Sequence, residues 1–443
     1  MGNFKTIVAV IFGAGLLVGV LIFSGLVPIG QKSKDGVAGA VGKVTLWGTV
    51  KRDVLSQQLS DFNDTNKTFT VSYVEKNPIT FNTELIEALA SGIGPDMIML
   101  PTDSILRYAD KIYPVPYASY PERTFRDTFI TEATLYLSSK GVMAFPMTVD
   151  PMVMYYNRAI FENAGIAVPP TTWEDIVALV PTLTKRDQQG VITQNAVALG
   201  EYDNVTNAKD VATLLMLQRG NGLVAIEQNK PFSVVENGSR TSKTPVKDAL
   251  AFYTGFANPT NTDLYSWNKS FPQSRDQFIA GKLAIYFGYA SELFAIQGRN
   301  PNLNFDITAI PQLKGTTEPI TFGKTTGVAV LKSSKNLNTS IIAASLMSSS
   351  NFVATYVSNL SQAGINFVPA RRDLLAQTPS SYYAPIIYRA GLTSRGWYDP
   401  HDEGSDAVFQ QVINGINSGL YTTDTAVEAL STRLTLLFKN ITF

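Results

Sequence analysis

The segment FPMTVDPMVMYYNRAIFENAGI, Phe145–Ile166, predicts where one lobe of the protein ends and another begins. Apolar runs stand on both sides of Thr148–Pro151, and the second run leads into a helical pattern at Arg158. Pro151 has no backbone N–H and biases Asp150 towards extended conformations. We therefore expect an irregular link between two sheets here, rather than one continuous strand.

The pattern of this segment resembles the signature of the extracellular solute-binding proteins of ABC importers, the family that includes maltose-binding protein. The resemblance extends over nearly all of the chain after the first 40 residues, and its clearest stretches are Pro146–Asn157, Phe161–Asn163, Ser91–Asp103, Phe278–Tyr286 and Gly364–Arg372. It implies an α/β fold of two lobes, the type II periplasmic-binding-protein fold, with mixed sheets flanked by helices. It also implies three crossings of the chain between the lobes.

The composition excludes several classes of function. The 443 residues are 45% hydrophobic, which is enough for two cores, and the 36 basic and 36 acidic side chains give no electrostatic reason to expect a nucleic acid partner. There is no cysteine, so disulfides, thiolate metal sites and the lipid-modified cysteine that tethers many relatives are excluded. His401 is the single histidine. We expect no metal and no cofactor.

The sequence does not predict an enzyme. Gly323-Lys324-Thr325 lacks the glycine that a phosphate-binding loop needs five positions before Gly323, where Glu318 stands, and no G-x-S-x-G motif occurs. Asp150 paired with Glu201 or Asp203 could serve a glycoside hydrolase only at a separation of about 5 to 10 Å. A hydrolase therefore stays as an alternative that the sequence cannot test.

The N-terminal segment reads as a membrane anchor. No charged residue occurs between Lys5 and Lys32, and Thr6–Val27 is almost wholly apolar. As a helix this run would be about 33 Å long, enough for a hydrocarbon core of roughly 30 Å. We expect residues 1–30 to form an anchor helix, with 31–42 as a linker. The alternative is a cleaved signal peptide, whose apolar region is usually shorter, about 7 to 15 residues.

Alternating strand and helix patterns from Lys43 onward predict βαβ units around mainly parallel strands. We expect passages between the lobes at 148–151, 287–291 and 332–336. These passages assign residues 43–149 and 289–331 to lobe 1, and residues 150–288 and 332–443 to lobe 2. The predicted hinge residues are Val149, Pro151, Gly288 and Lys332.

Ligands of such sheets lie beyond the carboxyl ends of the strands. Trp47 and Thr49, and then Thr102 and Asp103, occupy loops from which relatives contact their ligand, so the resemblance implies the same role here. Two alternatives stay open. Trp47 could pack in the core of lobe 1, and Asp103 could cap the helix that begins near Ser104.

Further candidates follow strands of the second lobe. The loop at Glu201, Tyr202 and Asn204 is polar and aromatic, and Asp150 and Tyr289 lie at predicted passages. Relatives that bind sugars use a late aromatic residue for stacking, which implies that role for Trp397 and Tyr398. The alternative for this pair is packing against a helix.

The expected function is that of a membrane-anchored, extracellular substrate-binding component of an ABC transporter. It would capture a sugar or oligosaccharide-like solute between its lobes and deliver it to permease subunits. We expect it to act as a monomer. The carboxylates would accept hydrogen bonds from sugar hydroxyls, and the aromatic rings would stack on sugar faces. A signalling receptor that reports its bound state to a membrane sensor is an alternative with the same sequence features.

Overall fold

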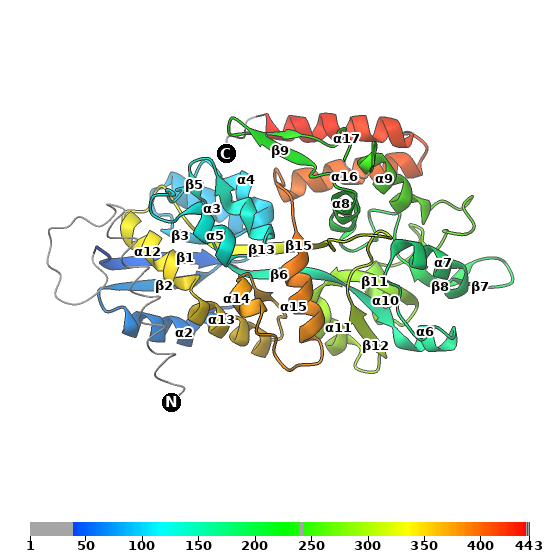
Figure 1. Cartoon of the computed structure of the whole chain (residues 1–443), viewed down its shortest axis with the longest axis horizontal. Coiled ribbons are helices and arrows are strands. Elements are labelled where there is room, and N and C mark those ends of the chain that lie inside the picture. The colour runs from blue at the N-terminus through cyan, green and yellow to red at the C-terminus, as the bar shows by residue number, and fades with distance from the viewer. Residues whose placement is uncertain (1–38, 240–241, 440, 442) are drawn as a thin grey trace.

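Two long antiparallel strands, β6 (Phe145–Asn157) and β13 (Thr321–Val330), run through the middle of the molecule and join its two α/β lobes (Figure 1). The structure is a computed structural model that describes residues 39–239, 242–439, 441 and 443. Strands are paired in the order β2-β1-β3-β13-β6-β11-β8-β7, and β12, β14 and β15 join at the sides. The predicted two-lobed α/β fold is confirmed.

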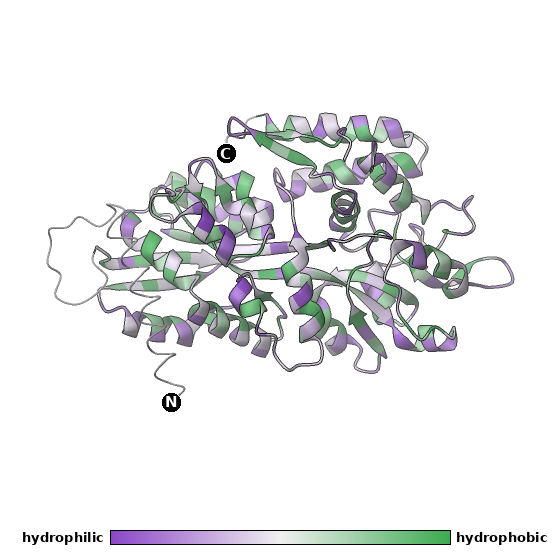
Figure 2. Cartoon of the chain, in the orientation of Figure 1, coloured by the Kyte–Doolittle hydropathy of each residue, from purple (hydrophilic) through white to green (hydrophobic). Residues whose placement is uncertain are grey.

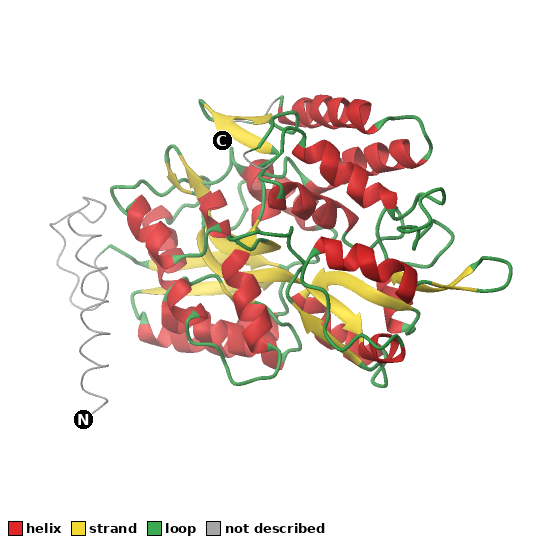
Figure 3. Cartoon of the chain, turned by 45° about the vertical axis from the view of Figure 1, so that its right-hand side comes forward, coloured by secondary structure: helices red, strands yellow, loops and turns green. Residues whose placement is uncertain are grey.

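The first lobe is built on the parallel strands β2 (Phe69–Glu75), β1 (Gly42–Gly48) and β3 (Met97–Pro101), beside the antiparallel β13 and the start of β6. Helices flank the strands on both sides (Figure 3). The first four residues of β3 are all buried, as is typical of a strand covered on both faces. The helices and short strands of this half are α2 (Arg52–Thr65), α3 (Phe81–Ala90), α4 (Ile105–Tyr108), α5 (Glu122–Thr128), β4 (Leu137–Ser138), β5 (Gly141–Val142), α12 (Leu337–Met347) and α13 (Ser350–Gln362).

The second lobe is built on the other end of β6. Strand β11 (Leu283–Tyr289) pairs antiparallel with it and parallel with β8 (Ile192–Val197), while β12 (Phe305–Thr308) pairs with its last residues. The remaining elements of this half are α6 (Arg158–Asn163), α7 (Trp173–Leu183), β7 (Lys185–Arg186), α8 (Ala208–Gln218), β9 (Val224–Glu227), β10 (Lys230–Ser233), α9 (Pro245–Gly255), α10 (Ser274–Ile279), α11 (Leu293–Arg299), α16 (Asp402–Asn417) and α17 (Thr423–Phe438).

A third group of short elements lies beside the shared strands. They are β14 (Val368–Pro369), which pairs with β6, α14 (Arg372–Leu375), α15 (Ala384–Thr393), and β15 (Ser394–Arg395), which pairs with β13. Helices such as α2, α7 and α16 carry apolar residues on one face and polar residues on the other (Figure 2). This is the pattern expected of helices that cover a sheet.

The expected irregular link at Thr148–Pro151 is wrong, because β6 is one continuous strand of 13 residues. Pro151 stands opposite Gly323 of β13. On its other side, β14 pairs with residues 148–149, and β11 ends at Tyr289, the partner of Met152, so no strand of the described residues pairs with Pro151 there. A residue without an N–H fits such a position without breaking the strand.

The strand pairings also differ from the predicted passages and domain boundaries. Gly288 pairs with Val153 inside the second lobe, and β12 stays in that lobe, so the chain does not cross at 287–291. Lys332 donates its N–H to the carbonyl of Lys111, and the following helix α12 packs against β1 and β13 of the first lobe. The chain passes between the lobes in β6, in β13 and beside β15. Of the predicted hinge residues, Val149 and Pro151 lie in such a passage.

Within the described residues, no single helix is both long and apolar enough to cross a membrane. Helices α12 and α13 satisfy that test only as a pair, and they meet at an angle of 67°. The predicted anchor at 1–30 lies outside the described residues.

We predict that Gly327→Ala destabilises the fold where β13 meets β6. A Cβ at Gly327 would lie 2.8 Å from the carbonyl oxygen of Phe145, which is closer than a real Cβ approaches an oxygen. Overpacking of this kind costs about 1 to 3 kcal/mol of the free energy of unfolding. The control is Gly298→Ala in α11, where a Cβ meets nothing within 4 Å, and it should raise stability by about 0.5 to 1 kcal/mol. Urea unfolding measures both, and equal effects would contradict the prediction.

Candidate interlobe binding site

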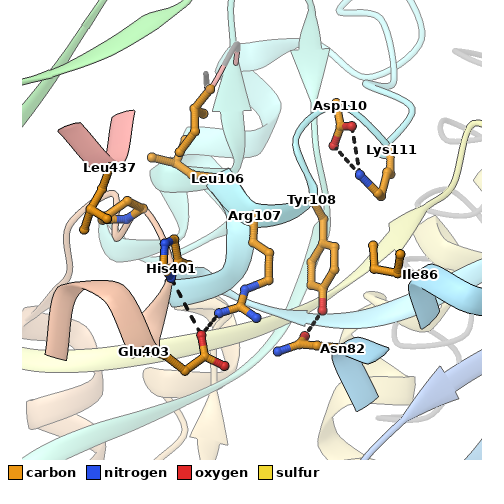
Figure 4. A pocket seen from close by; sticks show the side chains of 12 residues that line it. Asn82, Ile86, Leu106, Arg107, Tyr108, Asp110, Lys111, His401, Glu403 and Leu437 are labelled. Carbon is orange, nitrogen blue, oxygen red and sulfur yellow. Dashed lines mark hydrogen bonds and ion pairs between the residues drawn. The ribbon is translucent and has the colours of Figure 1, made fainter. Parts of the chain in front are cut away.

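A pocket of about 590 Å³ lies between the two lobes. We call it the interlobe pocket (Figure 4). Its first-lobe wall comes from α3, α4 and the turn that follows, and its second-lobe wall comes from the start of α16 and the end of α17. The lining residues are Asn82, Ile86, Leu106, Arg107, Tyr108, Asp110, Lys111, Pro400, His401, Glu403, Leu437 and Ile441.

Side chains from the two walls contact one another across the interlobe pocket. The guanidinium of Arg107 pairs with the carboxylate of Glu403, which joins the first lobe to the second. The Tyr108 hydroxyl donates a hydrogen bond to the side-chain oxygen of Asn82. His401 accepts a hydrogen bond at Nδ1 from the N–H of Gly404 at 3.0 Å and so caps α16. Burial lowers the pKa of His401, which keeps the imidazole neutral at pH 7.

A charged cluster adjoins the interlobe pocket through the first turn of α16. We define it as Asp103, Tyr202, Lys209, Asp210, Tyr289, Lys324, Asp399, Asp402, Ser405 and Asp406. Its central group is Lys324 of β13, whose Nζ lies 3.2 Å from Asp210 and 3.5 Å from Asp103. The hydroxyl of Tyr289 donates to Asp210 at 2.7 Å. Because Asp103 belongs to the first lobe and Asp210 to the second, Lys324 holds both lobes to a shared strand.

The other lysine of the cluster, Lys209, binds the start of α16 to α8. Its Nζ lies 2.5 Å from Asp402, 3.1 Å from Asp399 and 3.5 Å from Asp406. The hydroxyl of Tyr202 donates to Asp406 at 2.6 Å. Burial opposes the charge of Lys209, but these carboxylates outweigh it and hold the pKa of the ammonium above its ordinary value.

The charged cluster carries more acceptors than its own donors use. Five aspartates face two ammonium groups, so their unused oxygens can accept further hydrogen bonds. Burial raises the pKa of Asp399 to about 6, although Lys209 and Ser405 act in the opposite direction. Its Oδ1 is buried and has no hydrogen-bond partner among the described residues. Asp399 itself is only 1% exposed, and the described lining of the interlobe pocket contains Glu403 but none of the residues of the charged cluster.

The structure brings three of the predicted ligand residues together, namely Asp103, Tyr202 and Tyr289, all in the charged cluster. Trp47 lies apart, in β1, with the Lys76 ammonium 3.7 Å from its ring centre. Thr49 is exposed in the loop after β1.

Three predicted ligand residues use their polar groups within the protein. Asp150 accepts hydrogen bonds from the N–H and the hydroxyl of Ser291. The Asn204 side chain bonds to Trp267, Asn268 and Phe271. The partly buried carboxylate of Glu201 accepts from Asn417.

The predicted exposed stacking pair is wrong for Trp397, which is only 4% exposed and packs against Phe409. Tyr398 is half-buried, and its ring lies 5.2 Å from that of Phe443. The packing alternative therefore describes both residues. The sequence context of polar residues and glycine did not indicate that α16 would cover Trp397 or that Phe443 would pack on Tyr398.

Thr102, another predicted ligand residue, lies in a buried cluster with Glu132 and Thr325. Its hydroxyl donates to Glu132 at 2.7 Å and accepts from the N–H of Thr325 at 3.2 Å, and the Thr325 hydroxyl also donates to Glu132. This cluster fastens the end of β3 to β13. Burial raises the pKa of Glu132 to about 7, against the effect of the two hydroxyl donors.

Sequence reasoning missed Arg107 and Glu403 of the pocket and Lys209, Asp210 and Lys324 of the cluster. Lys324 was considered only for a phosphate-binding loop. The Lys209-Asp210 pair stands near the start of a helix, directly after the predicted loop at 201–204, and this position could have indicated it. No local signal predicts the Arg107 pair, because its partner is 296 residues away in the sequence.

Comparison with known proteins identifies the class. Residues 49–347 match the model of the bacterial extracellular solute-binding proteins, and the chain therefore belongs to this family.

Individual relatives are distant in sequence and similar in fold. A protein of Brucella abortus (strain 2308), named as a binding protein, is 21% identical over 340 residues, which are 73% of this chain and 76% of the relative. The sugar-binding protein MalE of Xanthomonas citri has a TM-score of 0.71 and 18% identity, covering 90% of this chain and 97% of that one. The cyclic alpha-maltosyl-1,6-maltose binding protein of Arthrobacter globiformis has a TM-score of 0.71 and 15% identity, covering 91% and 100%.

We predict that Glu132→Gln removes a pH dependence of stability. The folded-state pKa of about 7 lies above the ordinary 4.5, so the folded protein holds a proton here that the unfolded chain has lost. The stability of the wild type should therefore fall as pH rises from about 4.5 to 7 and then level off. Glutamine cannot ionise, so the variant should gain on the wild type by up to about 3 kcal/mol between pH 5 and pH 8.

Urea unfolding of both proteins at the two pH values measures this gain. The difference between variant and wild type isolates Glu132 from the other carboxyl groups. A difference that does not change with pH would contradict the prediction.

Proposed function

We propose that this protein is the substrate-binding component of an ABC importer, which captures a sugar or oligosaccharide-like solute between its lobes outside the cell and delivers it to permease subunits. The observation that carries the proposal is the interlobe pocket of about 590 Å³, whose walls come from both lobes and include Glu403, the next residue after Asp402 of the charged cluster. A volume of this size is typical of pockets that bind small molecules.

The residues of the interlobe pocket suit a polyhydroxylated ligand. The guanidinium of Arg107 and the amide of Asn82 can donate hydrogen bonds, and the carboxylates of Glu403 and Asp110 can accept them from hydroxyl groups. The ring of Tyr108 and the side chains of Ile86 and Leu106 supply apolar surface for a sugar face. The names of several relatives with this fold refer to maltose-type sugars, which supports the same class here.

Binding would be coupled to closure of the lobes about β6 and β13. The Arg107–Glu403 pair and the two carboxylates at Lys324 already join the lobes in the present arrangement. A ligand shifts the balance towards closure only by binding the closed arrangement more tightly than the open one. Contacts to both walls of the interlobe pocket would supply that difference.

The proposal is tested by a thermal-shift screen of the purified chain against maltose, longer maltodextrins, polyols and amino acids. A ligand that binds only the folded state raises stability by RT ln(1 + [L]/Kd), so a sugar of this class should raise Tm while amino acids should not. If no sugar or polyol raises Tm and an amino acid or peptide does, the proposed solute class is wrong.

We predict that Arg107→Met weakens binding of the sugar found in that screen by about 10- to 150-fold. A hydrogen bond to a charged group contributes about 1.5 to 3 kcal/mol, and methionine keeps the apolar stem but not the donors. The matched control is Arg123→Met in α5, because the Arg123 side chain is 93% exposed and, among the described residues, pairs with Asp127 of its own helix. Titration calorimetry should give the wild-type Kd for the control. If the wild type, Arg107→Met and Arg123→Met bind the sugar with equal affinity, Arg107 does not contact the ligand.

The anchor, the partner and the absence of catalysis are parts of the same proposal. Residues 1–30 would hold the protein at the cell membrane, and fractionation should recover the full-length chain with membranes.

Co-purification in the presence of the sugar should recover permease subunits, whereas recovery of a sensor kinase would favour the signalling alternative. Appearance of new reducing ends on incubation with oligosaccharides would favour the hydrolase.

A further inference from the structure

A second pocket, of about 650 Å³, lies on the opposite side of the shared strands. We call it the hinge-side pocket. Helices α11, α13, α14 and α15 form it, and they lie below β6 in Figure 1, whereas α16 and α17 lie above it. The two pockets therefore share no wall.

The lining of the hinge-side pocket is uncharged throughout, because none of its described residues is acidic, basic or histidine. The lining residues are Leu293, Phe294, Ala354, Val357, Ser358, Ser361, Gln362, Asn366, Phe367, Val368, Pro369, Leu374, Gln377, Pro379, Ser381, Tyr383, Ala384, Ile387 and Tyr388. The interlobe pocket, by contrast, contains an arginine, a lysine and two carboxylates. An ion entering the hinge-side pocket would lose hydration without gaining a partner of opposite charge.

Aromatic rings and the amide of Asn366 give the hinge-side pocket its recognition chemistry. Phe294, Phe367, Tyr383 and Tyr388 supply ring surface, and Phe294 remains 40% exposed. The side-chain nitrogen of Asn366 is buried and has no hydrogen-bond partner among the described residues. Buried donors without a partner are rare, so this group is available to an acceptor on a bound molecule.

We propose that the hinge-side pocket binds an uncharged small molecule that combines a flat apolar body with a hydrogen-bond acceptor such as a carbonyl oxygen. The apolar body covers the aromatic rings, and the acceptor receives the hydrogen bond from Asn366. The volume of the pocket lies within the range of small-molecule sites. This site does not depend on the proposed transport function, since it shares no lining residue with the interlobe pocket.

The test uses Prodan, an uncharged naphthyl ketone whose emission shifts to the blue in an apolar site, with the full chain. Prodan should bind saturably, and the anionic probe ANS should bind at least tenfold more weakly. Ala354→Trp places a large ring in the pocket and should weaken Prodan binding at least tenfold. The matched control is Thr355→Trp, because Thr355 is exposed, is the next residue of α13 and does not line the pocket, and it should leave the affinity unchanged.

A second variant tests the role of the amide. Asn366→Leu has a similar size but no donor, so it should weaken Prodan binding by about 3- to 10-fold, as expected for one hydrogen bond. It should not change the binding of 2-(dimethylamino)naphthalene, which lacks the carbonyl. These two measurements test binding in the hinge-side pocket even if Ala354→Trp does not fold.

Three results would overturn the proposal. The first is that both pocket variants bind Prodan as tightly as the wild type. The second is that ANS binds as tightly as Prodan. The third is that Asn366→Leu no longer binds the carbonyl-free probe. Sedimentation velocity gives a further contrary outcome. If the wild type forms a dimer that Ala354→Trp dissociates, a second copy of the chain covers this surface instead.

Discussion

The hydrogen-bonded pairing of β6 with β13 is the constraint on which both lobes depend. Each lobe builds its own part of the sheet on one end of this pair, so the two strands belong to both hydrophobic cores at once. The same pair carries Lys324 to the middle of the molecule, where carboxylates from each lobe meet it. The strands that hold the lobes together therefore also place the central charge of the candidate site.

That charge makes the candidate site different in character from the one that the sequence suggested. Aromatic rings were expected to stack on the ligand beside carboxylates that accept hydrogen bonds, but Trp397 is buried against Phe409 and Trp47 lies against Lys76. Charged groups dominate instead, and they lie partly out of water, where ion pairs lose hydration and gain strength only from good geometry. Lys209 has three carboxylates and a hydroxyl within reach, which is the kind of satisfied network that a buried lysine requires.

The family resemblance implied the two-lobed fold, and local signals in the sequence predicted the elements of its first lobe. The βαβ pattern of the first lobe and the strand at Phe145 follow from periodicity and from Gly and Pro positions over short windows. The same local reasoning misjudged Pro151, because its tolerance inside β6 depends on which neighbouring strands stop beside it. It also misplaced the two crossings predicted at 287–291 and 332–336. In Phe287–Ser291, for example, the glycine is equally compatible with a strand that leaves the lobe and with one that stays within it.

The candidate site was predictable only in part, for a related reason. Asp103, Tyr202 and Tyr289 stand at strand ends, which is a position that the fold class marks out. Arg107 and Glu403 meet only because the last helices of the chain fold back over α4, and no short window contains both. Asp150 and Thr102 were predicted to contact the ligand, but their polar groups bond to Ser291 and Glu132. Position along the chain could not reveal those partners.

The continuity of β6 has a mechanical consequence. Two adjacent strands joined by hydrogen bonds bend together, as a flat spring does, and resist shear along their length. A rotation of one lobe relative to the other would therefore have to bend both strands together. Pro151 and Gly323, which lie opposite each other, stand in the stretch that the two halves of the molecule share.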